Sequence, residues 1–156
     1  MRNVAHIVVR LPEDGARIVD DSPMPDVNCQ YIIALALVDG AVSFADSHSR
    51  ERMADPQIRA VKERVKLVAD RGLMDPDAPR SGLVQVTLQD GKTVSHLTRH
   101  PPGTKENPLD TAGLNAKVRD LMAPVLGGER TEAIIQRVNS LEELDDVRTL
   151  RAFLTA

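Results

Sequence analysis

Aromatic side chains are scarce in this sequence of 156 residues. It contains no tryptophan, and its three aromatic residues are Tyr31, Phe44 and Phe153. A surface that stacks nucleic-acid bases needs several aromatic rings, and a net charge of -3 gives no basic excess to neutralise phosphates. The sequence therefore argues against a nucleic-acid partner, and it predicts a core made of aliphatic side chains.

Cysteine is also scarce. Cys29 is the single cysteine, so the chain cannot form an internal disulfide or a cysteine-rich zinc site. This cysteine usage is typical of a reducing compartment. The sequence contains no apolar run of the ~20 residues that a membrane span needs, and the segment after Met1 lacks the apolar stretch of a signal peptide. We therefore expect a cytoplasmic chain without membrane contact.

The first half of the chain predicts a strand, a long loop and an apolar helix. The strand is expected over residues 6–11, and the loop over residues 12–25, which hold three prolines and four acids. Asp26 is expected to cap the helix over residues 29–38. That helix is apolar on nearly every side, which is typical of a helix that is buried all round. Further along, the sequence predicts a helix after Asp55-Pro56 and a strand over residues 65–69.

The second half predicts a β-hairpin followed by helices. Asp90-Gly91 separates strand patterns over residues 83–89 and 93–98, which is the strongest hairpin signal in the chain. Three helices are expected after it, beginning near Asp110, Gly128 and Ser140. Side chains expected to face inward on the first of them are Leu114, Val118, Leu121 and Met122. The pattern predicts one α+β domain over residues 1–156, with a mainly antiparallel sheet of about four strands covered by helices.

Few groups suggest chemistry. His96 and His100 are four residues apart, a spacing that would suit metal ligands on a helix, but the hairpin pattern argues against a helix there. The common nucleotide-binding and nucleophile motifs are missing, so we expect neither a metal nor a cofactor. Tyr31, in the first turn of the apolar helix, can present its hydroxyl to a cleft as a general acid. Alternatively, it is a core aromatic residue whose hydroxyl binds a backbone carbonyl. Spacing alone favours the second interpretation.

The loop over residues 100–108 is the other distinctive segment. Its glycine, Gly103, lies among three prolines and can offer backbone N–H groups to an anionic ligand. The alternative is a rigid connection between the hairpin and the helices. The residues alone favour the rigid connection.

Several segments together resemble the smaller, C-terminal domain of the MmgE/PrpD family, in order and at compatible spacing. They are residues 24–31 running on to 35–40, Asp55-Pro56, residues 84–91, residues 103–109 with the family's Gly-x-x-x-Asn-Pro signature, Ala116-Lys117, and residues 123–127 and 141–147. The resemblance covers nearly the whole chain. No single motif is sufficient to identify the family, and the resemblance rests on the whole set of segments occurring in the same order.

The resemblance implies a fold and an activity. The family includes 2-methylcitrate dehydratases, cis-aconitate decarboxylases and related epimerases, which act on small di- and tricarboxylates without metal. Its members have a large helical domain with most acid–base groups and a smaller α+β lid. This sequence resembles the lid only, so we expect the lid half or a remnant of such a carbon–oxygen lyase or decarboxylase, inactive alone. The alternative is a non-catalytic interaction or carboxylate-binding module.

The resemblance also implies site residues and partners. Tyr31 matches a tyrosine that faces the pocket in related decarboxylases, which makes it a candidate catalytic residue, and Gln30 and Gly103 are candidate substrate-binding residues. Pro102 departs from the family, which often carries Arg or Lys before the loop glycine. We expect a helical N-terminal-domain subunit or a second copy as partner, docking near the loop before Tyr31, and a small carboxylate as ligand.

Overall fold

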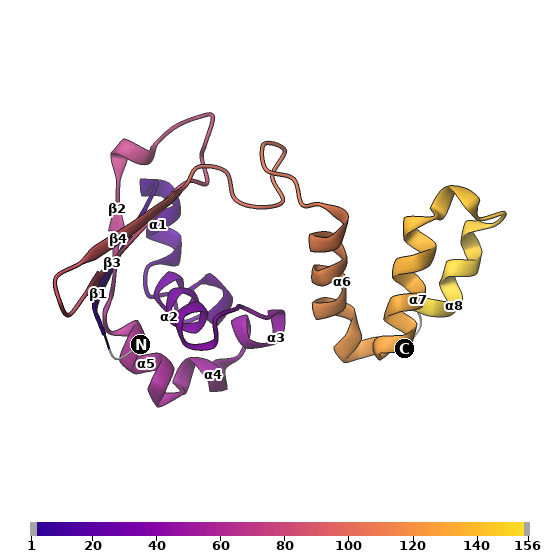
Figure 1. Ribbon diagram of the computed structural model, residues 1–156, viewed down its shortest axis with the longest axis horizontal. Helices are drawn as coiled ribbons and strands as arrows, with labels where there is room; N and C mark the ends of the chain where they lie inside the picture. Colours follow the sequence, from indigo (N-terminus) through magenta and orange to yellow (C-terminus); the bar gives the residue numbers. More distant parts are fainter. Residues whose placement is uncertain (1–2, 155–156) are drawn as a thin grey trace. The chain divides into compact units, whose positions relative to one another are not determined.

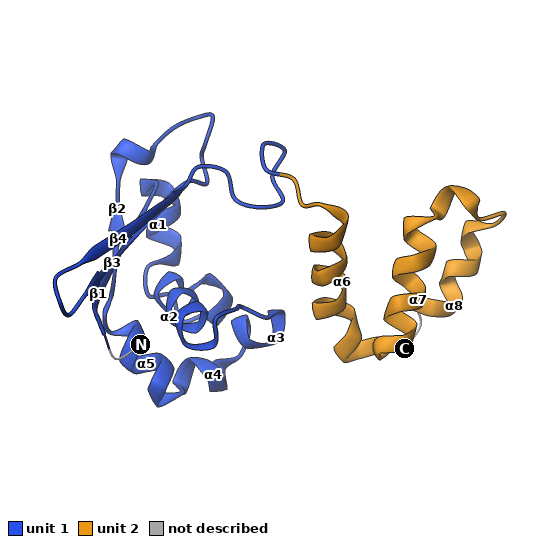
Figure 2. Ribbon diagram, viewed as in Figure 1, with its two compact units in different colours: residues 1–107 blue, residues 108–156 orange. Residues whose placement is uncertain are grey.

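The computed structural model describes residues 3–154. The chain divides into two compact units, Met1–Asn107 and Pro108–Ala156, which Figure 2 shows in different colours. Each unit is described by itself below. The single domain over residues 1–156 stays a prediction.

The first unit combines a sheet with short helices. Its strands are β1 (Val4–Leu11), β2 (Val65–Ala69), β3 (Gly82–Leu88) and β4 (Thr93–Thr98). Its α-helices are α1 (Glu13–Val19), α2 (Cys29–Asp39), α3 (Phe44–Ser47), α4 (Arg50–Ala54) and α5 (Pro56–Lys62), and 3-10 helices cover Pro25–Val27 and Arg71–Leu73.

The four strands form one sheet in the order β2-β1-β3-β4. β1 pairs in parallel with β2, where Ile7 lies opposite Val65, and antiparallel with β3, where Ile7 lies opposite Val86. The parallel pair is possible because five helices separate β1 from β2 in sequence, and a parallel connection needs a long crossover. The sheet is otherwise antiparallel, which confirms the predicted α+β class.

The core lies between one face of the sheet and the helices. Alternate strand residues face this side, so Ile7 and Val9 are 0% and 2% exposed. Figure 1 shows α1 and α2 beside the sheet, and α2 also packs against α5. The buried cluster consists of Ile7, Val9, Tyr31, Ala34, Leu35, Ile58, Val61 and Val65.

The expected loop over residues 12–25 is partly wrong, because α1 occupies Glu13–Val19. Pro12 precedes the helix and interrupts no hydrogen bond within it. Glu13 lies in the first turn and pairs with Arg17 one turn later, with 2.5 Å between Oε1 and Nη2. A proline that marks the start of a helix therefore looked like part of a loop.

The predicted cap of α2 is also wrong. Asp26 lies inside the 3-10 helix Pro25–Val27, and the cap is Asn28, whose Oδ1 accepts the N–H of Tyr31 at 2.8 Å. The helix ends as predicted, at Gly40 in the left-handed conformation.

Helix α2 is not buried all round, as the sequence had suggested. Tyr31, Ala34 and Leu35 are fully buried, whereas Ile32 and Leu37 are half-buried. One side of the helix faces the sheet and α5, so the core covers only that side.

The hairpin is confirmed, with the Asp90-Gly91 turn between β3 and β4. Gly91 adopts a φ of 85°, which favours glycine, and Asp90 Oδ1 accepts the N–H of Lys92 at 2.9 Å.

The second unit is helical in the part that the structure describes. It contains α6 (Thr111–Leu126), α7 (Gly128–Asn139), α8 (Arg151–Leu154) and 3-10 helices over Leu141–Glu143 and Val147–Leu150. Arg119 on α6 makes a two-pronged ion pair with Glu132 on α7, at 2.6 Å and 2.9 Å. Ile134 and Ile135 on α7 are each 6% exposed and form its small buried centre.

Two expectations for this unit are wrong. Leu114 and Leu121 of α6 are 51% and 38% exposed rather than inward, and none of the described residues of α6 is buried. The third helix is broken into 3-10 turns and the short α8. Ser140 does not cap it, because its Oγ donates backward to the carbonyl of Gln136 at 3.1 Å.

No helix within residues 3–154 combines the length and the apolar character that crossing a membrane would require.

The buried position of Leu35 gives a stability prediction. Leu35→Ala should lower the free energy of unfolding of the first unit by about 2–5 kcal/mol, because it removes a fully buried side chain between α2 and the sheet. Leu37→Ala on the same helix is the matched control and should cost clearly less, since Leu37 is only half-buried. Urea unfolding followed by circular dichroism measures both. Equal costs would contradict this account of the core.

Candidate functional site

Tyr31 is held at both ends. Its backbone N–H donates to Asn28 Oδ1, and its hydroxyl donates to the backbone carbonyl of Asp46 at 2.6 Å. The side chain is 0% exposed. The phenol therefore spans from the first turn of α2 to α3, and its hydroxyl has the carbonyl partner that the second interpretation of the sequence described.

A charged cluster lies close to this phenol. The guanidinium of Arg52 contacts carboxylates of Asp39 at 2.6 Å, Asp55 at 2.9 Å and Asp46 at 3.6 Å. Burial raises the pKa of Tyr31, and Asp46 and Asp39 raise it further, while Arg52 acts in the opposite direction. Tyr31 is therefore neutral near pH 7, and it can donate a proton but not accept one.

Helix α3, whose Asp46 carbonyl accepts the Tyr31 hydroxyl, is held in place by hydrogen bonds of its own. Ser43 Oγ donates to Asp46 Oδ2 at 2.7 Å and accepts the N–H of Asp46 at 3.0 Å. The ring of His48 lies 4.0 Å from that of Phe44, and its Nε2 is 3.8 Å from Asp26 Oδ2. The contact between His48 and Asp26 joins the end of α3 to the 3-10 helix Pro25–Val27, which precedes α2.

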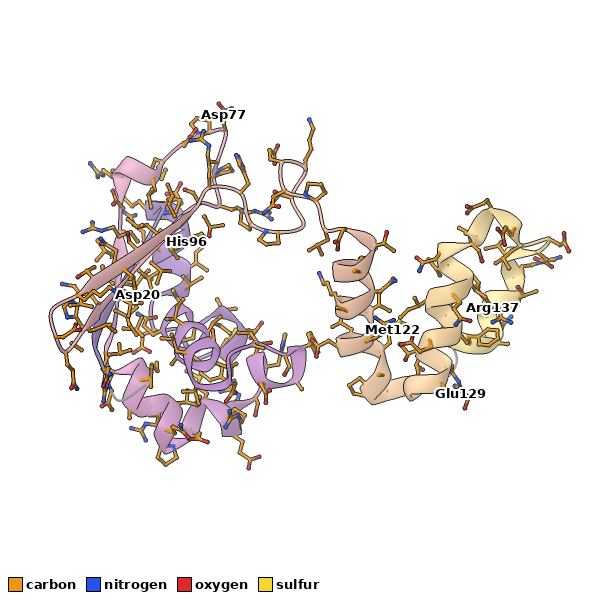
Figure 3. All side chains as sticks on the ribbon, in the orientation of Figure 1. Asp20, Asp77, His96, Met122, Glu129 and Arg137 are labelled. Atoms are coloured by element: carbon orange, nitrogen blue, oxygen red, sulfur yellow. The ribbon has the colours of Figure 1, made fainter. Side chains whose placement is uncertain are left out.

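Gln30 points to a different neighbour from Tyr31. Its Nε2 donates to Asp20 Oδ1 at 2.6 Å, and its Oε1 accepts the N–H of Asp21 at 3.0 Å. Asp21 has a φ of 45° and also binds Lys62, whose hydrogen bond is the main reason that its pKa lies below the usual range. Gln30 thus anchors the loop at residues 20–21, in the region where Figure 3 labels Asp20.

A cavity of about 520 Å³ lies beside Gln30. Besides Gln30, its lining includes the cations Arg59, Lys62 and Lys66 and the acids Asp20, Asp21 and Glu63. Opposite charges are mixed around this cavity, so it has no clear preference for an anion or a cation.

The loop around Gly103 is closed by its own hydrogen bonds. Gly103 has a φ of 88°, and its N–H donates to the carbonyl of Asn107 at 2.8 Å. The side chain of Asn107 donates to the carbonyl of His100 at 2.9 Å. These contacts explain the Gly-x-x-x-Asn spacing, and they engage the glycine N–H that a ligand would otherwise use.

A second cavity, of about 640 Å³, lies against this loop. It is lined by residues 76–80 and by Arg99, His100, Pro101, Gly103, Thr104 and Glu106. Arg80, Arg99 and His100 bring positive charge, although Asp77 and Glu106 also line it and Arg99 pairs with Asp75 at 2.6 Å. The Oγ1 of Thr104 is buried without a hydrogen-bond partner.

Sequence reasoning missed Arg80 and Arg99 as neighbours. They are far apart along the chain, but Gly82 of β3 pairs with Thr98 of β4, so the residues just outside these strands meet at one end of the hairpin. The only sequence signal was the hairpin itself, from which this juxtaposition follows.

The three predicted site residues do not share one cavity. Gln30 lines the first cavity, Gly103 lines the second, and Tyr31 lines neither of these two. Tyr31 and Gln30 are adjacent on α2 but have different partners: Tyr31 bonds to α3, and Gln30 bonds to the loop at residues 20–21. Their roles in catalysis and binding stay predictions.

The Tyr31 hydroxyl gives a stability prediction. Tyr31→Phe should cost about 1 kcal/mol near neutral pH, because it removes the hydrogen bond to Asp46. The native state holds the Tyr31 proton more tightly than the unfolded state does, so the wild type should also lose stability as the pH rises above 10. The variant should lack this part of the alkaline loss.

Urea titrations of both proteins at pH 7 and at alkaline pH measure this difference. Cys29, whose pKa burial raises to about 11, contributes equally in both proteins and cancels. Ser47→Ala, which removes an exposed hydroxyl from α3, is the control and should be nearly neutral. A Tyr31→Phe protein as stable as the wild type at both pH values would show that this contact contributes nothing.

The positive φ of Gly103 gives another prediction. Gly103→Ala should cost about 1–2 kcal/mol, because a Cβ is unfavourable in this backbone conformation. Gly15→Ala is the control, since Gly15 lies inside α1 with open space around it, and alanine should stabilise the helix by about 0.5–1 kcal/mol. Thermal unfolding of both variants checks the opposite signs. A neutral Gly103→Ala would mean that the loop relaxes to another conformation.

Comparison with known proteins places the chain. The model of the MmgE/PrpD C-terminal domain matches residues 1–143. The mitochondrial 2-methylcitrate dehydratase of Yarrowia lipolytica is 28% identical over 116 residues, covering 67% of this chain and 22% of that protein. The cis-aconitate decarboxylase of Aspergillus terreus is 25% identical over 164 aligned positions, covering 99% of this chain and 33% of that protein. The chain therefore spans a third or less of the length of these relatives. Because the family model covers residues 1–143, the chain belongs to the MmgE/PrpD family, whose C-terminal domain it matches.

Proposed function

We propose that this chain is the lid domain of a lyase of the MmgE/PrpD type that acts on small di- or tricarboxylates and is inactive alone. Dehydration of a substrate like 2-methylcitrate is the reaction we favour, with decarboxylation as the related chemistry. The observation that carries the proposal is Tyr31, a neutral phenol with a raised pKa beside Arg52. It lies in a domain of the MmgE/PrpD family, and the two relatives of the chain are named for dehydration and decarboxylation.

Tyr31 would act as the general acid. In a dehydration, a base removes a proton from carbon, a C=C bond forms, and the C–O bond breaks as the hydroxyl leaves with a proton to become water. Tyr31 would supply that proton, and the positive charge of Arg52 would favour the resulting phenolate. To reach a substrate, the hydroxyl must exchange the carbonyl of Asp46 for the leaving group.

Gln30 and Gly103 would help to bind the substrate. Gln30 borders the first cavity, and Gly103 holds the shape of the loop that borders the second. Because the N–H of Gly103 is already bonded to Asn107, its role would be to position the loop rather than to contact a carboxylate.

A helical subunit of the same family would complete the enzyme. Dehydration needs a base and carboxylate-binding cations that converge with the acid on one substrate. The described residues near Tyr31 include one cation, Arg52, but its guanidinium and the carboxylates of Asp39, Asp46 and Asp55 are already paired with one another. Leu114, Leu121 and Val125 are 51%, 38% and 70% exposed on α6, and their spacing puts them on one face of the helix. An apolar face of this kind suits packing against another helix.

The remaining parts of the proposal come from the sequence. A metal-independent reaction and a cytoplasmic location are expected from the family resemblance and from the single cysteine. Self-association is the other expected partnership. Fewer residues near the loop before Tyr31 are exposed for docking than the sequence suggested, because Asn28, Gln30 and Tyr31 are already buried within the chain.

A second candidate function is a non-catalytic carboxylate-binding or interaction module. The cavity beside Gly103 favours it, because Arg80, Arg99 and His100 gather there although Pro102 has replaced the cation expected in the loop. Such a module would bind a carboxylate without needing Tyr31.

The activity prediction follows from the missing base. The isolated chain should give no sustained turnover of 2-methylcitrate or cis-aconitate. Mixed with the helical N-terminal part of a family dehydratase, it should restore turnover, and Tyr31→Phe should then lower kcat by about 10²–10⁴-fold, as expected for the loss of a positioned acid. Progress curves followed by the absorbance of the unsaturated acid measure this.

Ser47→Ala is the control for this experiment, because it changes a hydroxyl on α3 that contacts neither Tyr31 nor Arg52. Turnover by the chain alone would overturn the proposal that it is inactive. Failure to bind the helical part, together with carboxylate binding that Arg80→Ala abolishes and Tyr31→Phe leaves intact, would favour the binding module.

A further inference from the structure

β4 is an edge strand without the usual protection. It follows β3 at the end of the sheet, and residues 93–98 contain no proline and no Lys, Arg, Asp or Glu. Val94 and Leu97 are 50% and 54% exposed. Natural proteins protect such edges with charges, prolines or bulges, but the pairing of β4 with β3 runs from Thr93 to Thr98 without interruption.

Alternate residues of β4 direct their backbone N–H and C=O groups away from β3. In an antiparallel pair, residues alternately direct their N–H and C=O groups toward the partner strand and away from it. The bond from the N–H of Leu88 to the carbonyl of Lys92 sets this alternation, so Thr93, Ser95 and Leu97 direct their backbone groups outward. Within residues 3–154, no backbone hydrogen bond joins β4 to a segment other than β3.

The opposite edge of the sheet differs. β2 carries Lys66 in its second position, and α1 packs against this strand. A charged lysine on an edge strand disfavours pairing with another chain. The sheet therefore has one edge strand with a charged residue and one without.

We propose that β4 pairs antiparallel with β4 of a second copy, around a two-fold axis at Ser95. In this register Ser95 lies opposite Ser95 of the second copy, and Thr93 lies opposite Leu97 in both directions. All these residues direct their backbone groups outward, so each pair exchanges both of its N–H···O bonds. The two sheets become one continuous sheet.

Side chains and charges are complementary in this register. Val94 lies opposite His96 of the second copy and Leu97 opposite Thr93, so each exposed apolar side chain gains a cross-strand neighbour. Figure 3 labels His96 on this strand. Arg99 comes opposite Gly91 and beside Asp90 of the second copy, and Lys92 comes opposite Thr98, so no like charges face each other.

The proposal is independent of the lyase function. It uses an edge strand that contributes none of the residues around Tyr31 and α3, so association with a helical subunit and pairing of two copies can be tested with different variants.

The test compares Ser95→Lys with Ala60→Lys in the full chain. Ser95→Lys places two lysines opposite each other at the axis, and it should weaken the dimer by about tenfold or more. Ala60→Lys adds the same charge at an exposed site on α5 and should leave the dimer unchanged. Sedimentation equilibrium from about 10 µM to 1 mM, a range suited to a weak interface, gives the dissociation constants.

Hydrogen exchange of the wild type provides a second measurement that requires no variant. Raising the concentration should slow exchange at the amides of Thr93, Ser95 and Leu97, and should leave those of Val94 and His96 unchanged because they already bind β3. A wild type that stays monomeric, equal dimerisation of the two lysine variants, or no slowing at these three amides would each overturn the proposal.

Discussion

The buried side chain of Asn28 organises the region on which the candidate site depends. Its Oδ1 accepts the N–H of Tyr31, and its Nδ2 donates to the carbonyl of Ser22 at 2.6 Å and to Asp21 Oδ1 at 3.2 Å. Because Asn28 is 0% exposed, each of these groups would lack water as a substitute. One amide therefore fixes where α2 begins, and the start of α2 fixes the directions of Tyr31 and Gln30.

Two adjacent residues of α2, Tyr31 and Gln30, contact different segments of the first unit. Tyr31 reaches α3 and the charged cluster around Arg52, whereas Gln30 reaches the loop at residues 20–21. A polar residue at the N-cap followed by an apolar helix is common in proteins of many functions. In this chain the phenol bonds to a backbone carbonyl of a short helix that is held by its own Ser43–Asp46 contacts.

Local signals predicted much of the fold. The Asp90-Gly91 hairpin, the Asp55-Pro56 helix start and the strand at residues 65–69 all follow from patterns within a few residues, and the structure confirms them. Helix α1 was missed because a proline count does not distinguish a helix start from a loop. The partner of the Tyr31 hydroxyl and the meeting of Arg80 with Arg99 depend on tertiary packing, which no local pattern encodes.

The parallel pairing of β1 with β2 also bears on how the chain folds. Ile7 and Val65 are neighbours in the sheet, yet every helix from α1 to α5 lies between them in sequence. A contact between such distant residues requires a large loop to close, which slows folding, whereas α6 and α7 meet through a short connection. The helical hairpin of the second unit therefore has a contact order that favours rapid folding, whereas the sheet of the first unit folds more slowly because the long crossover between β1 and β2 must close.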